Sequence, residues 1–104
     1  MSKSIDYQSY LIQTLTDPDE AAGYLNAALE GGDLDVFLLA LKNVVTAHGG
    51  MKILAEKTKR SRTSLYKSLS KTGNPHLKGT NDILHAMGMH LAVVAGNEEQ
   101  HLAG

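Results

Sequence analysis

The chain has 104 residues, a formal net charge of −1 and no cysteine, which excludes a disulfide framework, a thiolate metal site and a cysteine nucleophile. No apolar run approaches the roughly 20 residues that a membrane-spanning helix needs, and the polar first residues lack the apolar core of a secretory signal. We therefore expect a single domain over residues 1–104 of a cytoplasmic protein that does not enter a membrane.

The first half of the chain predicts three helices with acidic surfaces. Apolar residues at helical spacing predict a short helix over residues 7–15. Asp17 and Asp33 can each cap a further helix, and the glycine pairs at 31–32 and 49–50 can end those two helices. Residues 1–50 hold two lysines against seven carboxylates, a balance of −5, which indicates solvated acidic faces around a core.

The next segment, residues 51–78, is strongly basic. It holds eight of the ten lysines and arginines against one glutamate, a balance of +7. Two short helices are predicted, Met51–Thr58 and Arg62–Leu69, with a turn between them and Ser61 as the second cap. A cluster of turn-forming residues at 71–75 follows. A small domain with one strongly positive face is suited to a polyanion such as DNA.

The last segment predicts one helix and one strand. Thr80 can cap a helix that Gly88 closes. The apolar run Met89–Ala95 is short, contains a valine pair and lies between two glycines, which favours a strand. The predicted fold class is mainly α, with five or six helices around a helix-turn-helix core of the lambda-repressor type and one short C-terminal β-strand. Its parts are acidic N-terminal helices over residues 1–48, the basic helix-turn-helix over 51–78, and a helix plus a dimerising strand over 80–96.

A helix-turn-helix imposes packing rules on the basic segment. Its two helices lock at a fixed angle, so the first needs a small residue at the contact and the second needs an apolar residue that packs back against it. Ala55 and Leu65, ten positions apart, fit these requirements, and Leu69 continues the buried face. The opposite face of the second helix is polar and can reach base edges in the major groove.

The expected DNA-binding residues divide into base contacts and phosphate contacts. The guanidinium fork of Arg62 matches O6 and N7 of guanine, and Thr63 suits a thymine methyl or a phosphate. Lys67 suits a phosphate or a flanking base, whereas Tyr66 is equally compatible with the core and with DNA. The complete expected site is Lys59, Ser61, Arg62, Thr63, Ser64, Tyr66, Lys67 and Lys71.

One position departs from the usual pattern of the motif. The turn commonly has glycine four residues after the small residue, because the backbone there often has a positive φ. This chain has Lys59 instead. Either the lysine adopts that conformation at modest cost, or the turn is one residue longer.

No catalytic, metal-binding or cofactor-binding constellation accompanies these elements. No nucleophile lies beside a candidate base, and a helix start explains the carboxylates near residue 17. The histidines lack i,i+4 pairing and ligand-spaced companions, which indicates surface or helix-end positions for His48, His76, His85, His90 and His101. We expect a protein that is not an enzyme and that holds no metal or cofactor.

The basic segment resembles a known family. The runs Ala55–Thr58, Ser61–Leu69 and Gly73–Pro75 are similar to those of the HigA-like addiction module antidotes, members of the Xre/Cro-like helix-turn-helix group that are common on prophages. The likeness extends over Asp17–Leu91, about three-quarters of the chain. It implies a type II antitoxin that neutralises a RelE-like ribonuclease toxin and represses the operon encoding both. Because such ribonucleases are typically basic, we expect the acidic first half to contact the toxin.

The predicted strand also implies a homodimer. A lone strand leaves its backbone groups unpaired, so Met89–Ala95 is expected to pair with the same strand of a second copy. The resulting two-fold axis would match an inverted-repeat operator in double-stranded DNA. Two alternatives stay open: a stand-alone prophage repressor without a toxin, and a helical adaptor whose basic face meets an acidic protein.

Overall fold

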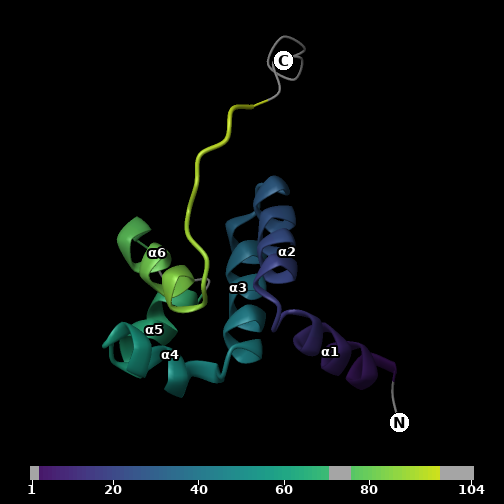
Figure 1. The fold of residues 1–104 in the computed structure, drawn as a ribbon, viewed down its shortest axis with the longest axis horizontal. Coiled ribbons are helices and arrows are strands. Elements are labelled where there is room, and N and C mark those ends of the chain that lie inside the picture. The colour runs from purple at the N-terminus through teal and green to yellow at the C-terminus, as the bar shows by residue number, and fades with distance from the viewer. Residues whose placement is uncertain (1–2, 71–75, 97–104) are drawn as a thin grey trace.

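The structure, a computed structural model, describes residues 3–70 and 76–96. Its six helices are α1 (Lys3–Thr14), α2 (Pro18–Glu30), α3 (Leu34–Ala47), α4 (Gly50–Thr58), α5 (Arg62–Leu69) and α6 (Leu77–Ala86). Helices α2 and α3 lie side by side, α4 to α6 gather on one side of this pair, and α1 projects on the other (Figure 1). The described part of the chain is therefore mainly α-helical, as predicted, and none of its helices is both long and apolar enough to cross a membrane.

The helices of the first half begin at the expected caps. The side chain of Asp17 accepts a hydrogen bond from the backbone NH of Asp19 at 3.0 Å, and Asp33 accepts one from Asp35 at 2.9 Å. Each aspartate satisfies an NH group that a helix start otherwise leaves unpaired. Among these three helices, only α1 begins far from its predicted start. It begins at Lys3, four residues earlier than predicted.

A glycine pair separates α3 from α4. Gly49 and Gly50 have φ values of +111° and +84°, a region that glycine enters without steric cost. A Cβ atom on Gly49 would lie 2.9 Å from Cγ1 of Ile53, so the close approach of α4 also requires glycine there. The pair lets the chain reverse into α4 and sets the position of the basic segment against α3.

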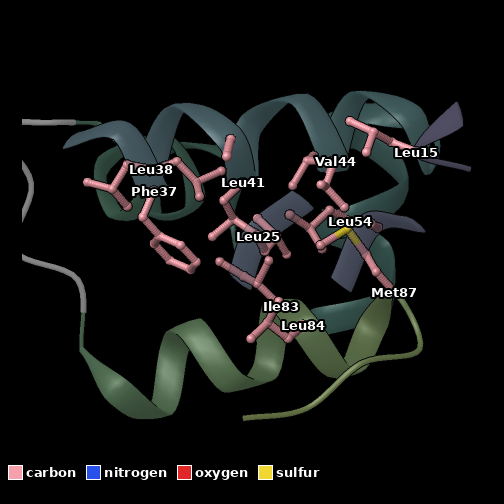
Figure 2. Packing of buried hydrophobic residues seen from close by; sticks show 14 of the residues in the cluster. Leu15, Leu25, Phe37, Leu38, Leu41, Val44, Leu54, Ile83, Leu84 and Met87 are labelled. Atoms are coloured by element: carbon pink, nitrogen blue, oxygen red, sulfur yellow. The ribbon is translucent and has the colours of Figure 1, made fainter. Parts of the chain in front are cut away.

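The core joins α2 and α3 to the three helices that follow. Figure 2 shows Leu25 of α2, Leu41 of α3, Leu54 of α4 and Ile83 of α6 meeting in the interior. All are 4% exposed or less. Because each helix contributes apolar side chains to one cluster, α4 and α5 are held rigidly on the rest of the molecule.

Helix α6 begins earlier than the sequence predicts. Its N-cap is His76, and the backbone NH of Thr80 donates to the carbonyl of His76 at 2.9 Å. Thr80 therefore lies inside the first turns, and its predicted capping role is wrong. The predicted C-terminus is right, because Gly88 has φ +85° directly after the helix.

The predicted C-terminal strand is absent from the described residues. The segment that follows α6 is anchored twice: the NH of Met89 donates to the Leu84 carbonyl at 2.9 Å, and the NH of Leu91 donates to Oδ1 of Asn81 at 3.1 Å. The segment that follows α6 then extends beyond the end of the α2–α3 pair (Figure 1). A strand needs a neighbouring strand to complete its ladder, and the described part of the chain supplies none.

Candidate nucleic-acid interface

Helices α4 and α5 pack in the manner that the sequence predicts for a helix-turn-helix. Leu65 is fully buried and Leu69 is 2% exposed, so both lie on the inner face of α5. Ala55 of α4 is partly buried and packs against the same cluster. The predicted inner and outer faces of α5 are therefore confirmed.

The turn between the two helices places a lysine in a glycine-like conformation. Lys59 has φ 59° and ψ 35°, which makes it the one non-glycine residue with a positive φ in the described ranges. Just before it, the hydroxyl of Thr58 donates to the carbonyl of Leu54 at 2.8 Å and closes the end of α4. Of the two alternatives for this turn, the structure adopts the standard length with a strained lysine.

The start of α5 is capped by Ser61. Its Oγ accepts a hydrogen bond from the NH of Ser64 at 3.0 Å, which confirms the predicted cap. The Ser64 amide is thereby engaged, whereas the hydroxyl hydrogen of Ser61 can still be donated outward. The first NH groups of α5 carry the positive end of the helix dipole, which attracts phosphate.

The outer face of α5 is polar and open to solvent. Arg62, Thr63, Tyr66 and Lys67 are all exposed, and Tyr66 retains 60% of its accessible surface. Tyr66 therefore does not belong to the core. Lys71, the remaining expected contact, lies outside the described residues.

Most of the basic residues on α4, the turn and α5 have no acidic partner. The ion pairs within the described residues are Arg60–Asp82 at 2.6 Å and Lys78–Asp82 at 3.3 Å. On α4, the turn and α5, five exposed basic residues have no carboxylate partner in the described ranges. They are Lys52, Lys57, Lys59, Arg62 and Lys67. The hydrogen bond from Arg60 holds the pKa of Asp82 below its ordinary value, helped by Lys78.

Asp82 is a positioning residue that the sequence reasoning missed. It lies on α6, yet it fixes Arg60, which leads into α5. The two residues are 22 positions apart, so no local pattern links them. Only the i,i+4 spacing of Lys78 and Asp82 was open to a sequence-based prediction.

The described histidines occupy structural positions. His48 caps the end of α3, and its Nε2 lies 2.8 Å from the Leu15 carbonyl. His76 occupies the N-cap position of α6 without a side-chain hydrogen bond to the helix, and the ring centroids of His85 and His90 lie 6.4 Å apart in an edge-to-face arrangement. No group of three or more potential ligand residues within the described ranges could hold a metal ion, and His101 lies outside them.

Comparison with known proteins places this chain in a family. Residues 3–95 match the family described as “Probable addiction module antidote protein”. An uncharacterized protein of Haemophilus influenzae is 33% identical over 79 residues, which cover 76% of this chain and 80% of that protein. No solved structure matches. Since the family match spans all six helices, the chain belongs to the addiction module antidotes, a family of antitoxins and not of enzymes.

Proposed function

We propose that this chain is a HigA-like antitoxin that binds operator DNA through α5, represses its own operon and neutralises a RelE-like ribonuclease toxin. The observation that carries the DNA-binding part is the outer face of α5. Four exposed side chains project from a helix whose inner face is locked into the core. Arg62 and Lys67 on this helix and Lys59 in the turn before it have no carboxylate partner in the described ranges, which supports a surface with the shape and the charge that a major groove accepts.

In the proposed complex, α5 lies in the major groove. Arg62 pairs with O6 and N7 of a guanine, and Thr63 and Tyr66 contact neighbouring bases or phosphates. Lys59, Lys67 and the N-terminal NH groups of α5 contact phosphates and fix the register of the helix. Lys71 adds a further phosphate contact in this proposal.

We further propose that the protein binds DNA as a homodimer through the segment after α6. Val93 is completely exposed and Val94 is 83% exposed, so two adjacent apolar side chains face solvent. The backbone of residues 92–96 makes no hydrogen bond to another described residue. Antiparallel pairing with a second copy would satisfy both features, and its two-fold axis suits an inverted repeat.

The DNA-binding part is tested with the DNA upstream of the chain's own gene. A footprint and a gel-shift titration at several salt concentrations should reveal one protected inverted repeat and an affinity that falls steeply with salt. Equal affinity for a scrambled duplex of the same composition would contradict sequence-specific repression. Absence of any DNA binding would favour the adaptor alternative.

The antitoxin part is tested with the product of the gene that adjoins this chain's gene. Induced alone, that product should arrest growth and cleave mRNA, and co-expression of this chain should restore growth. The two purified proteins should also form a stable complex. An adjoining product that is harmless and does not bind would favour the stand-alone repressor.

A further inference from the structure

One carboxylate lies among the basic residues of the helix-turn-helix region and binds two of them. Oδ2 of Asp82, on α6, accepts a hydrogen bond from Nη2 of Arg60 at 2.6 Å and one from Nζ of Lys78 at 3.3 Å. The side chains of Arg60 and Asp82 are 32% and 36% exposed, whereas that of Lys78 is 84% exposed. A short contact between two partly sheltered charges is stronger than a longer one in open solvent, so Arg60 is the main partner of Asp82.

This ion pair joins the turn of the motif to a helix outside it. Arg60 lies in the turn, directly before Ser61, the N-cap of α5. Asp82 precedes Ile83 and Leu84, which are buried and anchor α6 in the core (Figure 2). Asp82 therefore has a stable position, and through Arg60 it holds the backbone from which α5 begins.

The first turn of α5 depends on contacts outside the helix. A helix of eight residues is too short to be stable by itself, and Leu65, the fourth residue of α5, is the first that is buried. The cap formed by Ser61 is local to the same helix. In the described ranges, the one side-chain hydrogen bond or ion pair from residues 59–63 to another helix is that of Arg60 with Asp82. The ion pair is therefore what fixes the start of α5 against the rest of the molecule.

The ion pair also lies beside a strained residue. Lys59 has φ 59°, in the left-handed region, where the Cβ of an L-residue crowds the following carbonyl. Such a conformation persists only where the surrounding structure holds it. Because Arg60 is the next residue, its ion pair opposes relaxation of the turn. Relaxation would displace Lys59 and Arg62, two proposed DNA contacts within two residues of Arg60.

We propose that Asp82 is a positioning residue that determines how well α5 discriminates between DNA sequences, an inference that rests on the proposed DNA binding through α5. By holding Arg60, it keeps the first turn of α5 and Arg62 at the angle that base recognition needs. Contacts to base edges depend on distance and direction, whereas attraction to phosphate depends mainly on charge. The carboxylate itself repels phosphate, so Asp82 weakens binding to DNA in general while it favours binding to the operator.

The isosteric change Asp82→Asn separates positioning from charge, because the two effects have opposite signs. Loss of a negative charge alone would strengthen binding to every duplex, whereas loss of the ion pair would weaken binding to the operator. The parent and the variant are titrated with the upstream operator and with a scrambled duplex of the same composition, at a temperature where melting curves show both proteins folded. We expect the variant to lose about tenfold in operator affinity, the scale of one base contact, and to bind the scrambled duplex at least as tightly as the parent.

Glu56→Gln is the matched control. Glu56 is exposed on α4 and has no basic partner in the described ranges, so its removal changes the charge by the same amount without breaking an ion pair. Both affinities should rise alike, and the ratio of operator to scrambled affinity should stay within about twofold of the parent's. A second variant, Arg60→Asp combined with Asp82→Arg, restores the pair with its charges exchanged and should recover the parent's ratio.

The outcomes distinguish this inference from the proposed function. If Asp82→Asn keeps the parent's ratio, either with a lower melting temperature or with both affinities raised, the ion pair acts through stability or charge alone and the inference is overturned. A folded exchange variant that does not recover the ratio would show that Arg60 contacts the DNA itself and that Asp82 does not act by positioning it. If the parent has no preference for the operator, the proposed function fails, and this inference fails with it.

Discussion

At the scale of single residues, the backbone of Lys59 carries strain at the point where the two helices of the motif meet. An L-residue in the left-handed region loses roughly 1–2 kcal/mol to the contact between its Cβ and the following carbonyl. Glycine would remove that cost, yet the chain places a lysine there, with φ 59°. Lysine adds a positive charge beside the start of α5, so we infer that DNA affinity, and not stability, favours this residue.

Lys59→Gly should therefore raise the free energy of unfolding by about 1 kcal/mol and weaken binding to all DNA sequences alike. Urea titration and a DNA titration measure the two effects. The matched control is Lys52→Gly, which removes the same charge from an exposed position of α4 and should lower stability by up to about 1 kcal/mol. A Lys59→Gly variant no more stable than the parent would mean that the turn relaxes without strain.

Leu65 shows the opposite case, a residue on the motif that does not contact DNA. It is fully buried, and Leu65→Ala should lower the free energy of unfolding by about 2–5 kcal/mol, as large-to-small core changes do. The exposed residue Thr63 is the control, because Thr63→Ala should melt within a degree or two of the parent. A melting curve for Leu65→Ala that matches the parent would show that α5 does not pack on this face.

How far single residues can be predicted from the sequence depends on the range of their interactions. The faces of α5 follow from the 3.6-residue period, so Leu65, Leu69 and the exposed Arg62 are placed correctly. The ion pair between Arg60 and Asp82 joins residues from separate elements, and only the packing of α6 brings them together. The sequence shows eight basic residues between positions 51 and 78, but it does not show that Arg60 and Lys78 pair with Asp82.

At the scale of elements, local signals fix most helix starts but not all of them. Asp17 and Asp33 cap α2 and α3 because aspartate competes well for NH groups at a helix start. Thr80 could also have capped a helix, but α6 already begins at Leu77. Its extent depends on its packing against the core, which the local sequence does not reveal. The strand prediction at Met89–Ala95 failed because a strand depends on a neighbouring strand, and residues 3–70 and 76–96 contain none.

The contact between α6 and the turn gives a pH dependence of stability. Because Arg60 and Lys78 lower the pKa of Asp82 in the folded state, ionised Asp82 favours folding above the ordinary pKa of an aspartate. That contribution should disappear as the pH falls through the folded-state value. The stability difference between the parent and Asp82→Asn, measured by urea titration, should thus be largest near about pH 6 and shrink toward about pH 3. A difference that stays constant with pH would contradict the ion pair.

At the scale of the whole molecule, charge is divided unevenly between the first and second halves of the chain. The first fifty residues carry −5 and residues 51–78 carry +7, and the fold keeps these regions on separate helices around a shared core. In the proposed function, the basic helices meet DNA and the acidic helices meet the toxin. Membership of the antidote family implies a toxin as one partner, because an antidote acts on a toxin.

The proposed homodimer makes a prediction at this scale. Val93→Pro removes a backbone donor from the exposed segment and should shift the protein toward monomer in sedimentation or light scattering. Operator affinity should fall more than a single lost contact explains, because two half-sites no longer bind as one unit. Val93→Ala keeps the donor and should remain largely dimeric. An intact Val93→Pro dimer that still folds would assign the interface to another surface.

The central claim, that the outer face of α5 reads DNA, is tested most directly by titrating the upstream DNA and single-base variants of it with Arg62→Ala and Arg62→Lys. The lysine variant keeps the charge but loses the bidentate fork, so it separates base reading from simple attraction to phosphate. We predict that both variants lose about 1–3 kcal/mol of operator affinity and the preference for one guanine, while Arg62→Lys keeps the parent's salt dependence. Unchanged affinity and base preference in Arg62→Ala would contradict the claim.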